Sequence, residues 1–338
     1  MYVRAAVLLL FALAQHAHAQ FAAPALTSAE LAIVINDADP NSVEVGEYYR
    51  RVRNIPPANV VHVNIPGKPQ RLDPAPFDAL RRHIDSRLGP AIQAVLMVWT
   101  APYAVGCNGI TAAYTMGYDA AQCRSTCAAG RPSSYYNADD ARPFSNRGMR
   151  LSMLLPTESV AEAKALIDRG TASGFRVLPA TAYYLATSQQ ARNARARFFP
   201  RPAVLAAKKL TVTRLHADAL DGPRDILIYQ TGMASVAKLD TLGFVPGALA
   251  DHLTSFGGDL LGNSQMSSLR WLQAGATASY GTVSEPCNHW QKFPQPSVLL
   301  KHYVSGSTAI EAYWRSVAWP AQGVFIGEPL AAPYRRQR

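Results

Sequence analysis

Residues 31–65 read LAIVINDADPNSVEVGEYYRRVRNIPPANVVHVNI, and this stretch decides the fold class. The apolar run 31–36 predicts a buried strand that leads into a turn. Asp39 and Pro40 then start a helix, which a later Pro-Pro pair ends. Residues 60–65 predict a second strand. Links this short between two strands and a helix predict parallel pairing with a right-handed crossover.

The rest of the chain continues this alternation of strands and helices. Further strands are predicted at 91–99, 150–155, 180–186, 225–231, 246–253, 276–283 and 323–327. Further helices are predicted at 77–88, 159–169, 266–273, 298–304 and 309–317, with a basic helix near 189–199. This order predicts an α/β fold, with a mostly parallel sheet covered by helices on both faces. We expect one domain over 20–338, in which 102–147 forms a long loop insertion; the alternative is a split into two domains near residue 150.

Residues 1–19 have the features of a secretory signal peptide. One basic residue, Arg4, precedes an apolar stretch at 5–14, and the small residues Ala17 and Ala19 follow. The apolar stretch is too short to cross a bilayer, which takes about twenty residues, and no later run of that length is present. We therefore expect cleavage after Ala19 and an exported protein without a transmembrane span, either periplasmic or extracellular.

The chain has four cysteines, Cys107, Cys123, Cys127 and Cys287. An even number of cysteines in an exported protein predicts two disulfides. Three pairings are possible, and we favour Cys123 with Cys127 and Cys107 with Cys287. The alternative is a metal site at Cys123 and Cys127, but their spacing has no matching Cys or His pair downstream.

Positive charge is concentrated in one part of the chain. The formal charge is +10, or +9 once Arg4 is removed, and no acidic residue lies between Asp168 and Asp218. That interval holds Arg176, Arg192, Arg195, Arg197, Arg201, Lys208, Lys209 and Arg214. Arg192 and Arg195 are candidates for binding an anionic envelope component. The alternative is a solvated helix face. Nucleic acid is disfavoured as a partner because no aromatic-interleaved binding motif accompanies the charge.

Ligands of open α/β sheets bind at the carboxyl ends of the strands, so residues that follow predicted strands are candidate site residues. The first strand ends at Asn36, a candidate binding residue, and is followed by Asp37, a candidate catalytic residue. A later strand supplies Asp251, His252, Thr254, Ser255, Gly257 and Gly258. Thr254 is a candidate binding residue, and the two glycines would let backbone amides approach a ligand.

Asp251, His252 and Ser255 are the residue types of a hydrolytic triad. Neighbours on a strand point to opposite faces, so these three are not expected to form a triad among themselves. We expect Ser255 or His252 to meet a residue from another strand end: Asp37, Glu285 or His289. The alternative is structural, with Asp251 and Ser255 capping a helix and His252 in the core.

Two more carboxylates follow predicted strands. Glu285, Cys287 and His289 alternate along the chain and could bind a metal, but only if the segment is extended and Cys287 is reduced. Glu328 lies between a glycine and a proline, where it could bind a ligand or hold a loop by accepting amide hydrogen bonds. No cofactor motif is present.

Five stretches resemble a family of exported bacterial proteins of unknown function. They are IVINDADPNSVEVGEYYRRVRNIP (33–56), YYLATSQQARNARARFFP (183–200), ADHLTSFGGDL (250–260), QMSSLRWLQAGATASYGTVSEPCN (265–288) and AYWRSVAWPAQGVFIGEPLA (312–331). The resemblance covers nearly all of the mature chain. It implies no known activity and no catalytic residues.

The run 250–283 is also similar to part of the gingipain-like cysteine peptidases, which have a caspase-like fold. In those enzymes a strand ends in a Cys-x-Gly element, and a helix and a Gly-Ala strand follow. Here LTSFGG, SLRWLQ and AGATASYG stand in that order. Thr254 and Ser255 occupy the place of the nucleophile, and the third strand ends in WTAP (99–102) where those enzymes carry a His-Gly pair. The resemblance implies a caspase-like three-layer sandwich, and these two departures from the motif argue against cysteine-peptidase activity.

Two functions are consistent with these observations. The first is an exported hydrolase-like protein with its site at the strand ends. The second is a non-catalytic protein on the same scaffold, which binds a peptide, a glycan or another anionic envelope component.

Overall fold

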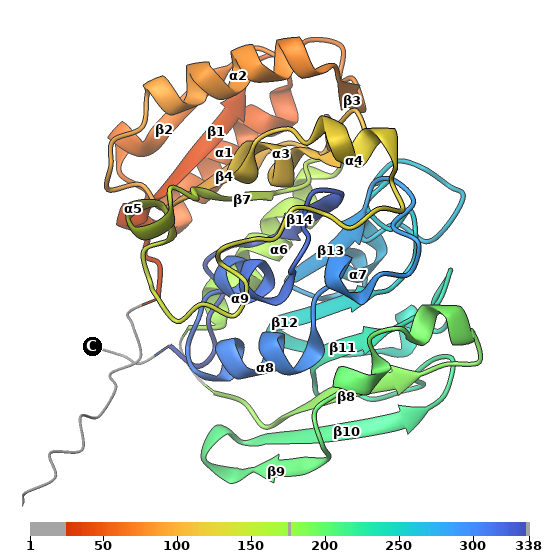
Figure 1. Cartoon of the computed structure of the whole chain (residues 1–338). Coiled ribbons are helices and arrows are strands. Elements are labelled where there is room, and N and C mark those ends of the chain that lie inside the picture. The colour runs from red at the N-terminus through yellow and green to blue at the C-terminus, as the bar shows by residue number, and fades with distance from the viewer. Residues whose placement is uncertain (1–24, 175–176, 336–338) are drawn as a thin grey trace, which may run out of the picture.

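The computed structural model describes residues 25–174 and 177–335 (Figure 1). The predicted signal peptide, 1–19, lies outside the described residues. Within the described ranges, no helix is both long and apolar enough to cross a membrane.

The centre of the protein is an eleven-stranded sheet in the order β2-β1-β4-β7-β14-β13-β12-β11-β8-β10-β9. Its strands are β1 (Leu31–Asn36), β2 (Val60–Val63), β4 (Ala94–Val98), β7 (Leu151–Leu154), β8 (Ala180–Ala186), β9 (Ala203–Leu205), β10 (Leu210–His216), β11 (Ile226–Thr231), β12 (Phe244–His252), β13 (Ala278–Thr282) and β14 (Gly323–Gly327). A small second sheet has the order β3-β5-β6, formed by β3 (Arg71–Leu72), β5 (Ala104–Val105) and β6 (Asn108–Gly109).

Helices cover both faces of the large sheet, as predicted (Figure 1). They are α1 (Pro40–Val52), α2 (Pro74–Ser86), α3 (Ile110–Met116), α4 (Ala120–Arg124), α5 (Pro143–Arg147), α6 (Val160–Ala172), α7 (Leu269–Ala274), α8 (Pro296–Val304) and α9 (Ala309–Ser316). Neighbouring residues on β12 show the two faces. Asp251 points to the face where Tyr313 of α9 lies, and His252 points to the face where Trp271 of α7 lies.

The large sheet contains the same strand order twice. The first four strands of the chain in this sheet lie in the order β2-β1-β4-β7, and a later four lie in the order β10-β8-β11-β12. Neighbours within each set are parallel. Each set therefore has a point where the order reverses, between β1 and β4 and between β8 and β11, and such points are where open α/β sheets bind ligands.

Two regions differ from the prediction. The insertion 102–147 is not a plain loop, because it contains β5, β6 and the helices α3 to α5. The predicted basic helix near 189–199 is two short 3₁₀ turns, η3 (Gln190–Asn193) and η4 (Ala196–Phe198). Arg195 lies between these turns and is buried, so the segment cannot be a regular solvated helix.

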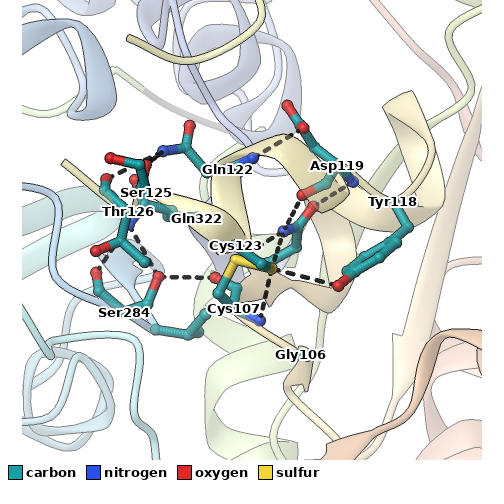
Figure 2. The surroundings of a disulfide bond; sticks show 12 residues. Gly106, Cys107, Tyr118, Asp119, Gln122, Cys123, Ser125, Thr126, Ser284 and Gln322 are labelled. Carbon is teal, nitrogen blue, oxygen red and sulfur yellow. Dashed lines mark hydrogen bonds between the residues drawn. A yellow bond between two sulfur atoms is a disulfide. The ribbon is translucent and has the colours of Figure 1, made fainter. Parts of the chain in front are cut away.

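All four cysteines form disulfides, but the favoured pairing is wrong. Cys107 is bonded to Cys123 and Cys127 to Cys287, with Cα atoms 5.3 and 5.1 Å apart. Cys123 lies in α4, where Asn108 Nδ2 and the Tyr118 hydroxyl donate to its sulfur (Figure 2). Cys127 lies beyond the end of α4 and reaches the loop after β13 instead. Because α4 ends between Cys123 and Cys127, the two cysteines form disulfides with different partners.

Candidate functional site

The end of β12 lies beside the end of β11, with His252 opposite Thr231 in parallel register. Asp251, one residue earlier, is fully buried and forms an ion pair with Arg195. Gln230 Nε2 donates to Asp251 Oδ2 at 2.9 Å. Burial raises the pKa of Asp251, and the Arg195 charge opposes that shift.

Arg195 does not have the exposed position expected of a residue that binds an anionic partner. Its guanidinium donates to the backbone oxygens of Thr231, Asp251 and Pro294 as well as to the Asp251 carboxylate. These bonds tie the segment after β8 to the ends of β11 and β12. A buried arginine that is paired in this way is held by structural contacts.

His252 has both ring nitrogens in hydrogen bonds. Trp271 Nε1 donates to His252 Nδ1 at 2.9 Å, so the ring proton lies on Nε2, which is 3.0 Å from the backbone oxygen of Met266. Burial lowers the pKa of His252 to about 3. The ring is neutral and has no free nitrogen that could accept a proton from a nucleophile.

The loop after β12 is organised by a residue that the sequence analysis did not single out, Gln265. Gln265 Oε1 accepts from the Thr254 hydroxyl at 2.7 Å and from the Phe256 amide at 2.9 Å. Arg192 Nε lies 3.4 Å from the Thr254 hydroxyl oxygen. Ser255 is half-buried, and its hydroxyl is bonded to no described residue. Ser255 therefore lies just beyond a strand end as predicted, but among the described residues no base is hydrogen-bonded to its hydroxyl.

The glycine pair after Ser255 is used for close packing. A Cβ atom on Gly258 would lie 2.6 Å from the backbone oxygen of Gly281 in β13. The Gly258 amide donates to the Thr282 oxygen at 2.9 Å. On Gly257, a Cβ atom would lie 3.3 Å from the His252 ring. The main contacts of both glycines are thus with the protein itself.

β12 lies between β11 and β13, and β4, the strand whose end corresponds to the His-Gly pair in the sequence comparison, is not one of its neighbours. β4, which ends before Trp99, is separated from β12 by β7, β14 and β13. β11 ends at Thr231, whose backbone oxygen accepts from the Leu253 amide at 2.9 Å, and the chain continues as Gly232-Met233. Gly232 is required there, because a Cβ atom would lie 2.1 Å from the backbone oxygen of Arg192.

Asn36 and Asp37 are far from His252. β1 and β12 are five strand positions apart in the sheet, a separation of about 24 Å. Asp37 pairs instead with His62, at 2.7 Å between Oδ1 and Nδ1, and both side chains are about half exposed. The Asn36 side chain bonds both ways with the backbone of Ile65, which holds the turn after β2. The predicted meeting of Asp37 with His252 or Ser255 does not occur.

A cavity of about 620 Å³ opens beside the Asp37–His62 pair. Its walls come from the end of β2, the segment that follows it, and α2. The lining is mostly apolar: Val63, Ile65, Pro66, Pro69, Leu72, Pro76, Ala79 and Leu80, with Asp37, His62, Asn64 and His83 as the polar members. We call this cavity the β1–β2 pocket. His83 Nε2 contacts the backbone oxygen of His62 at 3.1 Å, while His62 Nε2 is bonded to no described residue.

Glu285 and His289 lie in the loop that Cys287 anchors by its disulfide. Glu285 Oε1 accepts from the Cys287 amide at 2.8 Å, and His289 Nε2 lies 2.9 Å from the backbone oxygen of Cys127. Cys287 is oxidised, so it is not a metal ligand. In the described ranges, no group of three or more His, Cys, Asp or Glu side chains is arranged to hold a metal.

Glu328 lies away from the other candidates. β14 runs antiparallel to β13, so Glu328 lies at the start of β13, where its amide donates to the Thr277 oxygen at 3.0 Å. Its buried carboxylate bonds with Arg53 and accepts from the Tyr49 hydroxyl at 2.7 Å. It also accepts from the Leu330 amide at 3.3 Å, which is the loop-holding role considered for it.

The fold is similar to that of two proteases of known structure. The chain is similar to gingipain R, an Arg-specific cysteine proteinase, with a TM-score of 0.50, 10% identity, and coverage of 90% of this chain and 78% of that one. It is also similar to a structure described only as a protease, with a TM-score of 0.50, 9% identity, and coverage of 92% and 79%. No protein-family model matches the sequence, and no curated protein matches it either. The gingipain-like, caspase-like fold inferred from residues 250–283 is confirmed at the level of the fold.

Proposed function

We propose that this protein is an exported, non-catalytic peptide-binding protein on a peptidase-related scaffold. The observation that carries the proposal is the β1–β2 pocket, an apolar cavity of about 620 Å³ at strand ends. Ligand sites are concave and mostly apolar, with few polar groups and volumes of about 300–1,000 Å³. The similarity to proteinases of known structure favours a peptide among the ligand classes considered.

The hydrolase hypothesis has less support at the other strand ends. A serine nucleophile needs a base within hydrogen-bond reach and a third group that orients the base. His252 is neutral and bonded at both nitrogens, and Asp251 is paired with Arg195. Ser255 has neither of them as a base.

The lining of the β1–β2 pocket defines the peptide that it fits. Aliphatic and proline side chains form its walls, so an aliphatic or aromatic side chain of the peptide fills it. Asp37 and His62 lie at the pocket with exposed polar groups, which can bond to the backbone of the same peptide.

Binding of N-phenyl-1-naphthylamine, a neutral dye that fluoresces in apolar surroundings, tests the pocket. Ala79 lines the pocket from the exposed side of α2, whereas Ala75 is exposed on the same helix and does not line it. We expect Ala79→Trp to weaken dye binding at least tenfold, because the indole fills the cavity, and Ala75→Trp to leave it unchanged. Equal affinity in both variants contradicts the pocket as the binding site.

Two capped peptides then test the ligand class by competing with the dye. We expect acetyl-Ala-Phe-Ala-amide to displace the dye from the wild-type protein at least ten times better than acetyl-Ala-Glu-Ala-amide, with neither peptide cleaved. Cleavage of either peptide by the wild-type protein contradicts the non-catalytic part of the proposal. Failure of both peptides to displace a dye that binds normally contradicts the peptide part alone.

A further inference from the structure

A second cavity lies between α6 and α7, on the face of the sheet to which His252 points. It has a volume of about 240 Å³. Its apolar lining comes from both helices and includes Ala163, Leu166, Leu269 and Leu272, with Pro156 at one end. We call it the α6–α7 pocket. Its lining residues lie between β7 and β13 in the sequence, and none of them lines the β1–β2 pocket.

Arg169 gives this pocket a cationic group that lacks a counter-ion. Its Nη2 donates to the backbone oxygens of Leu272 and Ala276 at 3.0 and 3.2 Å. Its Nε is buried without an acceptor, and its Nη1 is bonded to no described residue. None of the ion pairs found among the described residues includes Arg169.

The charge of Arg169 is only weakly compensated by the protein. Burial lowers the pKa of Arg169. The negative charge of Glu162, an exposed residue two turns earlier on α6, acts in the opposite direction and raises it. Removing part of an arginine from water without a carboxylate partner costs free energy, which an incoming anion recovers by accepting from the free guanidinium nitrogen.

We propose that the α6–α7 pocket binds a small aliphatic carboxylate, such as a free fatty acid of short chain or the carboxyl end of a peptide with an aliphatic last residue. The carboxylate accepts from Arg169, and the aliphatic group lies against Leu166, Leu269 and Leu272. Glu158 and Glu162 line the same pocket and favour a cation at that end. A preference for an anionic ligand would therefore show that Arg169 determines binding, and a preference for a cationic ligand would show that the two glutamates do.

Thermal unfolding with added hexanoate tests this site in the full mature protein at fixed ionic strength. A ligand that binds only the native state raises Tm with a saturable dependence on its concentration. We expect hexanoate to raise Tm in this way, and acetate and hexylamine to have no effect, because acetate lacks the aliphatic chain and hexylamine carries the opposite charge. N-acetyl-leucine distinguishes a peptide carboxyl end from a fatty acid, because only the peptide source predicts that it binds more tightly than hexanoate.

Matched variants connect the effect to the pocket. Ala165 and Ala161 are both exposed on α6, but only Ala165 lines the pocket. We expect Ala165→Trp to weaken hexanoate binding at least tenfold and Ala161→Trp to leave it unchanged. Arg169→Met should abolish binding, whereas Arg270→Met, which removes an exposed arginine of α7, should not. The proposal is overturned if hexylamine binds as tightly as hexanoate, or if Ala165→Trp keeps the wild-type affinity. Arg169 then only caps the end of α7.

Discussion

Arg195 and Asp251 form an ion pair in the interior of the protein, where each side chain is 1% exposed. Removing one partner of such a pair leaves an uncompensated buried charge, which costs roughly 3–5 kcal/mol. We expect Asp251→Asn and Arg195→Met each to lower the free energy of unfolding by about that amount, measured by urea denaturation. The double variant should lose less than the sum of the two. Arg201→Met, at an exposed arginine, should change stability by less than about 0.5 kcal/mol.

The buried His252 predicts how stability depends on pH. Its pKa is about 3 in the folded protein and about 6.5 when unfolded, so the unfolded chain binds the extra proton between these values. The contribution of His252 is therefore complete above about pH 6.5 and is lost as pH falls toward 3, by up to about 1.4 kcal/mol per pH unit. His302, with a folded pKa of about 4, acts in the same direction.

Urea denaturation between pH 4 and pH 7 measures this dependence. In His252→Gln the amide can still accept from Trp271 and donate to Met266, but it does not titrate. We expect the pH slope to become shallower in His252→Gln and to stay the same in His216→Gln, at an exposed histidine. An unchanged slope in the His252 variant would mean that the imidazole titrates normally in the fold.

Ser255 is expected to be unreactive toward a fluorophosphonate probe. Such probes label serines that a neighbouring base activates, and the ring of His252 has no free nitrogen. Mass spectrometry should find the same low labelling in the wild-type protein and in Ser255→Ala, with trypsin as a positive control. Labelling of Ser255 in the wild-type protein would restore the hydrolase hypothesis.

The two disulfides should stabilise the fold to different extents. The Cys107–Cys123 bond closes a loop of 16 residues and the Cys127–Cys287 bond one of 160. Chain entropy predicts roughly 3 and 5 kcal/mol respectively. We expect Cys127→Ser with Cys287→Ser to lower Tm more than Cys107→Ser with Cys123→Ser. Peptide mapping without reduction checks the pairing directly, and a Cys123–Cys127 peptide would contradict the structure.

The sequence predicts the central strands well and the edge of the sheet poorly. β1 and β11 each begin with an uninterrupted apolar run, LAIVI and ILIY, because they are buried on both faces, and both are recognised with accurate ends. β10, at Leu210–His216, was missed. It lies next to the edge strand, where most of its residues are partly or fully exposed. Its sequence, LTVTRLH, has the apolar-polar alternation of a half-buried strand, which differs from the continuous apolar runs of the central strands.

The candidate site was harder to predict than the strands, because side-chain partners depend on the order of strands in space. Asp37 and His252 both follow strands, but nothing in the sequence places β1 and β12 five positions apart. The partners of His252 and Thr254, which are Trp271 and Gln265, come from the following loop and helix. The sequence predicts a helix over 266–273, but no motif in this segment indicates its polar contacts with the end of β12.

The position of β14 has a consequence for how the protein is made. Among the described residues β14 is the last strand in sequence, yet it lies between β7 and β13 in the interior of the sheet. A ribosome synthesises the N-terminal residues first, so the other strands of the large sheet are made before β14, which together with β13 joins the two sets. Until residues 323–327 arrive, β7 and β13 have unpaired edges of the kind that associates with other chains. Pairing of β14 with β7 and β13 thus removes two exposed strand edges from the interior of the sheet.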